Sequence, residues 1–245
     1  MSSVGFSLRG LLFLVVGVPG TLLASLAVLI GGLMRAPRGF HDRVQRWWSQ
    51  ILLAAAGVEV RVSGEENLES GGAQVLACNH QSMFDILALM ATVPASVRFV
   101  AKAEITSVPV FAGAMRSSGH VFIDRTNPRQ AITQMRSFGE RMRRDGLSVV
   151  VFPEGTRSRD GQLRRFKRAP FLLAIEADAP VLPVAVEGGG GVMPKGTVWT
   201  RPGRMSLRIG PALATDGLDA SDRGDLAECA HDRVADLLEE IRDRG

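Results

Sequence analysis

An uncharged stretch of 24 residues, 11–34, constrains the fold of this 245-residue chain more than any other feature. As one helix it would be roughly 36 Å long, enough to cross the hydrocarbon core of a bilayer. Pro19 interrupts the stretch, and Gly31 and Gly32 loosen its end. A cleaved signal peptide is disfavoured, because the stretch is longer than a usual signal core and no clear cleavage site follows it. The sequence therefore predicts a membrane-associated segment.

The location of the net charge supports this prediction. The formal charge is +4, and residues 1–50 account for all of it with five arginines and one acid, Asp42. A basic excess beside an apolar segment is typical of a membrane protein, whereas a nucleic-acid-binding protein spreads its basic residues over a folded polar face. We therefore expect contact with membrane lipids and no nucleic-acid partner.

A second apolar pattern follows a basic break at residues 35–38. Its apolar residues recur at helical spacing and include two adjacent tryptophans: Phe40, Val44, Trp47, Trp48, Ile51, Leu52 and Ala55. Tryptophan suits the headgroup layer, so this amphipathic helix is predicted to contact the membrane; an ordinary helix packed on the core is the alternative. Two topologies stay open. The first segment either spans the bilayer or forms, with the second, a hairpin that dips into one leaflet and is kinked at Pro19.

From residue 58 onward, short apolar runs alternate with helical patterns. Strands are predicted at residues 58–62, 74–78, 97–101, 120–123, 147–152, 181–186 and 205–209. Helices are predicted at residues 82–90, 109–116, 128–144, 168–177 and 218–242, with Asn127 as an N-cap, and the glycines at 188–191 are predicted to form a flexible loop. This alternation predicts an α/β domain over residues 58–245, with a mixed sheet covered by helices, preceded by membrane-associated helices over residues 1–57.

The densest polar cluster, residues 79–85 (NHQSMFD), follows a strand that is predicted to be buried. A histidine at the end of such a strand lies at the carboxyl edge of the sheet, where open α/β folds bind ligands. Asp85 can fold back onto His80, fixing the tautomer and leaving the other ring nitrogen as a base. The alternative is a capping pair without chemistry. No G-x-S-x-G motif supplies a nucleophile, although Cys78 lies two residues from His80.

Two further polar clusters follow predicted strands, at residues 119–125 (GHVFIDR) and 152–158 (FPEGTRS). Each places one arginine, Arg125 or Arg157, just past a strand end. Together with backbone N–H groups at Gly155 these arginines are suited to hold a phosphate, although single surface arginines are the commoner case. The four histidines are dispersed and no HExxH, CxxC, P-loop or GxGxxG motif occurs, so we expect no metal and no nucleotide cofactor.

Taken in order, these clusters resemble the motifs of the glycerolipid acyltransferases. Residues 79–85 are similar to the HxxxxD motif, residues 119–125 to the second motif and residues 152–158 to the third, and residues 181–184 (VLPV) resemble the fourth. The resemblance covers roughly residues 55–215 and points to the bacterial members that acylate 1-acylglycerol-3-phosphate. The ordered set is far more specific than any one motif.

The resemblance implies transfer of a fatty acyl group from acyl-ACP or acyl-CoA to the free hydroxyl of a lysophospholipid, giving phosphatidic acid. It makes His80 the general base and Asp85 its orienting partner. The implied substrate-binding residues are Lys102, Arg125, Glu154, Gly155, Thr156 and Arg157, with Pro183 shaping an acyl pocket. It also implies a place on the cytoplasmic face of the bacterial inner membrane.

Two alternatives remain at this point. The acceptor can be another lysolipid, such as lyso-ornithine lipid, because the acceptor pocket is not readable from sequence. The chain can also be a catalytically inactive scaffold that binds anionic lipid through residues 114–168, which carry a net charge of +8.

Overall fold

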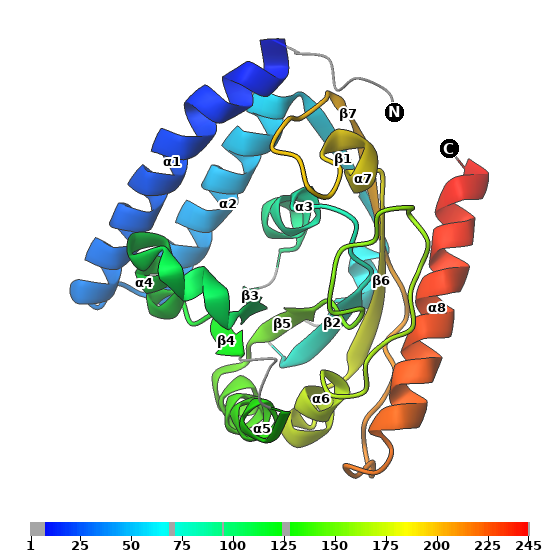
Figure 1. Ribbon diagram of the computed structural model, residues 1–245. Helices are drawn as coiled ribbons and strands as arrows, with labels where there is room; N and C mark the ends of the chain where they lie inside the picture. The colour runs from blue at the N-terminus through cyan, green and yellow to red at the C-terminus, as the bar shows by residue number, and fades with distance from the viewer. Residues whose placement is uncertain (1–7, 69–71, 95, 124–127, 245) are drawn as a thin grey trace.

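The computed structural model describes residues 8–68, 72–94, 96–123 and 128–244. Within these residues, one seven-stranded sheet lies between two layers of helices (Figure 1). One layer holds α1 (Leu8–Leu33), α2 (Arg38–Ala56), α3 (Phe84–Thr92), α4 (Pro109–Ser117) and the single turn α7 (Gly189–Val192). The other holds α5 (Pro128–Asp145), α6 (Phe171–Ala177) and α8 (Arg223–Arg244), and two short 3-10 helices are η1 (Glu65–Asn67) and η2 (Ala103–Ser107).

The strands of the sheet lie in the order β1-β7-β6-β2-β5-β3-β4. They span β1 (Val58–Ser63), β2 (Gln74–Cys78), β3 (Val97–Lys102), β4 (Val121–Ile123), β5 (Ser148–Val151), β6 (Val181–Glu187) and β7 (Gly203–Ile209). Neighbouring strands are parallel except for the antiparallel pair β6–β7. The predicted fold class, a mixed sheet covered by helices, is therefore confirmed.

Two apolar cores flank the central strand β2. Leu76 and Cys78 pack with α2 and α3 on one face, and Val75 and Ala77 pack with α5, α6 and α8 on the other. All five residues of β2 are buried, as expected of a strand covered on both faces. This burial fixes the position of the end of β2 and therefore the position of the residues that follow it.

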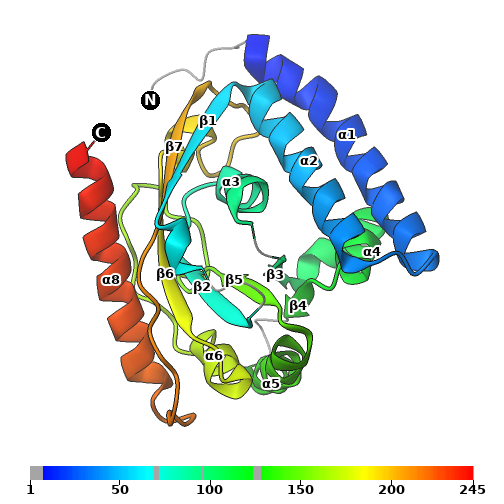
Figure 2. The ribbon, with the colours of Figure 1, turned by 180° about the vertical axis from the view of Figure 1, so that it is seen from behind.

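The helix α1 lies beside α2 along its length, and both views show the pair on the side of the molecule opposite α8 (Figure 2). Pro19 lies inside α1 without ending the helix, so the predicted interruption is wrong. Among the described residues, α1 is the one helix long and apolar enough to cross a membrane, and only 17% of its most apolar window is buried. Its end packs closely on α2, because a Cβ on Gly31 would lie 2.5 Å from the Phe40 ring.

The polar face of α2 points into the protein. Asp42 accepts a hydrogen bond from the buried guanidinium of Arg98 at 2.7 Å. Arg46 donates to the carbonyl oxygens of Ala91 and Val93, at the C-terminal end of α3, at 3.0 and 2.6 Å. These contacts satisfy carbonyls that the helix leaves without partners, and they place positive charge at its negative end.

The outer face of α2 carries exposed apolar side chains beside the exposed polar residues Arg43 and Gln50. Trp47 is 67% exposed and Ile51 is 55% exposed. On the inner face, His120 accepts the N–H of Phe99 at Nδ1 and lies 2.9 Å from Gln45 through Nε2. Burial, aided by the nearby Arg98 charge, lowers the pKa of His120 to about 3, so the ring is neutral.

Every predicted strand has an observed counterpart whose bounds differ by at most two residues. Two further predictions are wrong, and α6 begins at Phe171 rather than at residue 168. Residues 188–191 do not form a flexible loop, because α7 is helical and packs on α3 and β7. The helix α8 begins at Arg223 rather than at residue 218, because Asp219 and Asp222 instead hold a turn through their side chains. The predicted cap Asn127 lies outside the described residues, although α5 does begin at Pro128.

Candidate active site

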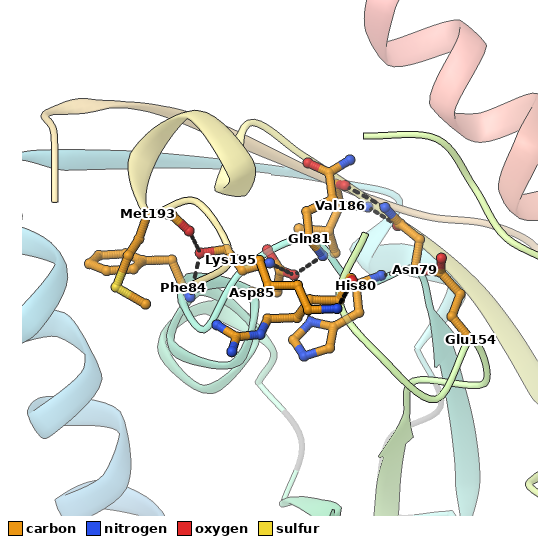
Figure 3. A network of polar contacts seen from close by, with 11 residues as sticks. Asn79, His80, Gln81, Phe84, Asp85, Glu154, Val186, Met193 and Lys195 are labelled. Atoms are coloured by element: carbon orange, nitrogen blue, oxygen red, sulfur yellow. Dashed lines mark hydrogen bonds and ion pairs between the residues drawn. The ribbon is translucent and has the colours of Figure 1, made fainter. Parts of the chain in front are cut away.

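The candidate site begins where the central strand β2 ends. His80 follows β2 and Asp85 lies in the first turn of α3, and the two side chains meet with Nδ1 2.8 Å from Oδ2 (Figure 3). An ionised carboxylate only accepts hydrogen bonds, so Nδ1 carries the proton and Nε2 keeps its lone pair. Nε2 makes no hydrogen bond with any residue that the structure describes. The predicted His–Asp pair therefore forms, with one ring nitrogen left open.

The Asp85 carboxylate is fully buried at the start of α3. Oδ2 accepts two further hydrogen bonds, from the N–H groups of Gln81 and Ser82 at 2.7 and 2.8 Å. Such main-chain donors at a helix start favour the ionised form of a carboxylate. Oδ1 has no hydrogen-bond partner among the described residues, and it faces Gly189, where an added Cβ would lie only 2.2 Å away.

His80 is also held by the residues that follow β5. Its ring stacks on Phe152, with the centroids 4.0 Å apart and an interplanar angle of 18°. Its N–H donates to Glu154 Oε1 and its carbonyl oxygen accepts the N–H of Ser158, both at 2.7 Å. The strands β2 and β5 are parallel neighbours, so their carboxyl ends bring these two motifs together.

Glu154 is buried and both of its carboxylate oxygens accept main-chain hydrogen bonds. Oε2 binds the N–H of Arg164 at 3.1 Å, in addition to the bond from His80 to Oε1. Burial raises the pKa of Glu154, and the two N–H donors oppose that rise. The geometry thus makes Glu154 a positioning residue that joins two loops.

The turn after Glu154 carries the predicted phosphate-binding arginine. Gly155 has a φ of +76°, which favours glycine. Its N–H donates to the carbonyl of Phe152 at 3.0 Å, so this N–H is not available for a phosphate as the sequence suggested. The half-buried Arg157 guanidinium makes no hydrogen bond or ion pair with any described residue. Thr156 is exposed beside it.

Comparison with known proteins shows the family of the chain. Residues 59–187, more than half of the chain, match the family model described as Acyltransferase. The chain belongs to this acyltransferase family. It is 34% identical, over 80% of its length, to the 1-acyl-sn-glycerol-3-phosphate acyltransferase of Saccharomyces cerevisiae. It is 35% identical, over 78% of its length, to the chloroplastic enzyme LPAT1 of Arabidopsis thaliana.

A solved structure of an acyltransferase covers nearly the whole chain. It is the 1-acyl-sn-glycerophosphate acyltransferase of Thermotoga maritima, which superimposes with a TM-score of 0.82 and 26% identity over 96% of this chain and 95% of its own. The curated relatives are longer proteins. The chain spans 65% of the length of the yeast relative and 54% of that of the Arabidopsis relative.

The other residues predicted for the site lie at varied places. Lys102 ends β3, and its Nζ lies 2.7 Å from Glu104 Oε1, with both side chains exposed. Arg125 lies outside the described residues. Pro183 is buried in β6 beside Gly210, on the face of the sheet that α8 covers, so no contact places it near His80.

Two side chains of the first motif connect the candidate site to β6 and to the segment after it. Asn79 exchanges two hydrogen bonds with the main chain of Val186, at 2.8 and 2.7 Å. Ser82 Oγ accepts the N–H of Phe84 at 3.2 Å and donates to the carbonyl of Met193 at 2.9 Å. Ser82 therefore bonds to the start of the helix from one residue before the N-cap position of α3, which Met83 occupies.

Sequence reasoning missed the segment of residues 188–201, which contacts both Asp85 and the turn after Glu154. Gly189 lies against Asp85, and Lys195 donates to Thr156 Oγ1 and to the carbonyl of Arg157 at 2.8 and 2.9 Å. The one available signal was composition, because Lys195 is one of only three lysines beside 26 arginines.

Cys78 does not act as a second reactive group in this geometry. It is buried, and burial raises the pKa of its thiol well above the usual value, so it stays protonated. Its Sγ lies 3.8 Å from the carbonyl of Leu76, within its own strand. Among the described residues, no three His, Cys, Asp or Glu side chains gather as a metal site.

Proposed function

We propose that the chain transfers a fatty acyl group from a thioester donor, acyl-ACP or acyl-CoA, to the free hydroxyl of 1-acylglycerol-3-phosphate. The observation that carries this proposal is the open Nε2 of His80, whose other nitrogen is held by Asp85 at 2.8 Å. The acyltransferase family and the printed names of the relatives support the same reaction class. The product of this reaction is phosphatidic acid.

The proposed chemistry needs one base and no protein nucleophile. Nε2 of His80 takes the proton of the acceptor hydroxyl as its oxygen attacks the thioester carbonyl, an effect of about 10²–10⁴-fold. The new C–O bond forms, the C–S bond breaks, and the proton passes from Nε2 to the departing thiolate. Asp85 stabilises the imidazolium that exists between these two transfers.

We propose that the acceptor phosphate lies at the turn after Glu154. Arg157 offers a guanidinium without a partner among the described residues, and guanidinium binds phosphate through paired hydrogen bonds. Lys102 and Arg125 remain predicted phosphate ligands, although the Nζ of Lys102 is already paired with Glu104. The apolar groove beside α1 and α4, about 410 Å³ in volume, suits a fatty acyl chain and is lined in part by Phe13, Leu22, Val108 and Phe111.

We propose that α1 and α2 form a hairpin that dips into one leaflet and does not span the bilayer. The helix α1 lies alongside α2, whose inner face is pinned to the α/β domain by Asp42 and Arg46. A spanning α1 would draw these buried charges into hydrocarbon, which is costly. The exposed side chains of α1, with Trp47, supply an apolar membrane-facing surface. The cytoplasmic face of the bacterial inner membrane remains the predicted location.

The deciding experiment is an acyl-transfer assay of the purified chain with a panel of lysolipid acceptors, with products identified by mass. The panel includes 1-acylglycerol-3-phosphate, lyso-ornithine lipid and phosphate-free 1-acylglycerol, each offered with acyl-ACP and with acyl-CoA. We expect phosphatidic acid to form fastest. Faster acylation of lyso-ornithine lipid would overturn the acceptor assignment, and vesicle binding without turnover on any acceptor would overturn the enzymatic function.

A further inference from the structure

Lys195 lies between the two halves of the candidate site, one formed by His80 and Asp85 and the other by the turn after Glu154. Its ammonium reaches the third motif from the loop after α7 and donates to Thr156 Oγ1 at 2.8 Å and to the carbonyl oxygen of Arg157 at 2.9 Å. Figure 3 shows Lys195 in the same cluster as His80 and Asp85. An ammonium has three N–H donors, so one remains for a ligand.

A single peptide group connects Lys195 with the histidine. The carbonyl of Arg157 accepts from Lys195, and the N–H of the same peptide group, on Ser158, donates to the carbonyl of His80 at 2.7 Å. The ammonium is therefore one peptide group away from the main chain of the proposed base. The proposed reaction needs the acceptor phosphate within the length of a glycerol unit from that base.

The charge of Lys195 has no counter-ion within the part of the chain that the structure describes. No carboxylate of the described residues pairs with Lys195, and none pairs with Arg157. Lys102, a predicted phosphate ligand, is paired with Glu104 at 2.7 Å. The one acid of the turn, Glu154, is buried and engaged by two N–H groups. Two adjacent cations without a counter-ion are the electrostatic signature of an anion site.

We propose that Lys195 is a phosphate ligand of the acceptor site and acts together with Arg157. This inference rests on the proposed acyl-transfer function and adds a cation that none of the recognised motifs contains. The two hydrogen bonds to Thr156 and Arg157 hold the ammonium in place before the substrate arrives, which lowers the entropy cost of binding.

Phosphate could also come from the donor, because coenzyme A and the prosthetic arm of acyl carrier protein both carry phosphate groups. The acceptor is favoured, since Lys195 bonds directly to the turn of Arg157. A ligand of the donor phosphate would change the KM for the donor, whereas a ligand of the acceptor phosphate changes only the KM for the acceptor.

The test compares Lys195→Met, which keeps the length of the side chain and removes its donors, with Lys195→Arg, which keeps the charge. For Lys195→Met we expect the KM for 1-acylglycerol-3-phosphate to rise about 10- to 100-fold, as for the loss of one charged hydrogen bond. Its rate with phosphate-free 1-acylglycerol should equal that of the wild type, and Lys195→Arg should restore most of the affinity. Arg233→Gln on α8 is the charge-matched control.

Three results would overturn the proposal. An equal loss on both acceptors would show that Lys195 only positions the turn. A rise in the KM for the donor alone would assign the phosphate to the donor, and wild-type kinetics for Lys195→Met would remove any role. Failure of the proposed function is separate, because the wild-type chain would then acylate no lysolipid. Thermal unfolding of each variant shows whether it is folded.

Discussion

The two halves of the candidate site differ in how their polar groups are satisfied. On the half that holds His80 and Asp85, one carboxylate oxygen receives three hydrogen bonds and the imidazole is stacked, bonded and fixed in one tautomer. On the half formed by the turn after Glu154, the Arg157 guanidinium has no partner and Lys195 has no counter-ion among the residues that the structure describes. The geometry of the His80–Asp85 pair is thus set in the free protein, although Asp85 Oδ1 has no partner among the described residues. In the proposed function, an anion supplies the partners that the cations of the other half lack.

This difference follows from what each half does in the proposed reaction. A base must have its orientation and its lone pair set before the hydroxyl arrives, because reorganisation at that moment would raise the barrier. A phosphate site gains more from unpaired cations, since a counter-ion of the protein would have to be displaced first. The halves should therefore respond differently to substitution, the first in kcat and the second in KM.

The largest expected effect is that of His80→Ala. Removal of the base should lower kcat by about 10²–10⁴-fold and leave the KM for the acceptor within a few fold of the wild type. Steady-state acyl transfer at varied acceptor concentration measures both parameters, with thermal unfolding as the control for folding. Turnover within tenfold of the wild type would contradict the assignment of the base.

Arg157→Gln should have the opposite effect, changing KM rather than kcat. We expect the KM for 1-acylglycerol-3-phosphate to rise about 10- to 100-fold while kcat at saturation stays close to the wild type. Arg159→Gln is the matched control, because it removes one exposed positive charge from the same loop. A loss of kcat without a change in KM would erase the distinction between the two halves.

Gly189→Ala tests how tightly the first half is packed. The new methyl group would lie 2.2 Å from Asp85 Oδ1, so either the carboxylate or α7 must move. We expect kcat to fall about tenfold through misplacement of the pair and stability to fall by about 1–3 kcal/mol. Gly191→Ala in the same turn is the control, since nothing lies within 4 Å of its added Cβ. Equal activity of the two variants would show that Asp85 tolerates displacement.

The smallest effect on activity is expected outside both halves, at His120. Its pKa of about 3 in the folded chain lies below the value of 6.5 in the unfolded chain, so the unfolded state binds the extra proton between these values. Stability should therefore fall as the pH is lowered from 6.5 toward 3, by at most about 1.4 kcal/mol per pH unit for this group. In His120→Asn that slope should be smaller, with acyl transfer near neutral pH unchanged. Denaturant unfolding from pH 7 to pH 4 gives the slopes, and identical slopes would contradict the assignment.

The strands and the His–Asp pair were predictable from local pattern. Buried runs such as residues 147–152 are apolar and rich in valine, and the spacing of Asp85 from His80 matches one helical turn at the end of a strand. The stacking of Phe152 on His80 depends on β2 and β5 being neighbours. Strand order depends on contacts between distant parts of the chain, so no local sequence pattern predicts it.

The features that the sequence did not reveal depend on tertiary contacts. Four consecutive glycines have the poorest helix propensity short of proline, yet α7 forms where Gly189 must approach Asp85. The polar residues between the apolar positions of α2 are typical of a solvent-facing side. Asp42 and Arg46 instead bind buried partners on β3 and α3. Lys195 lies far in sequence from the turn that it contacts, and its role depends on that contact alone.

The contacts made by the inward polar face of α2 fix the distance between the membrane-facing Trp47 and the candidate site. Arg46 binds the last carbonyls of α3, and α3 begins at the turn that holds Asp85. The packed helices α2 and α3 therefore connect the exposed Trp47 with His80. In the proposed membrane-bound state, the depth at which the acceptor headgroup meets the base is set by these two helices and not by the lipid. Bilayers of different thickness should therefore present the same hydroxyl to the same nitrogen.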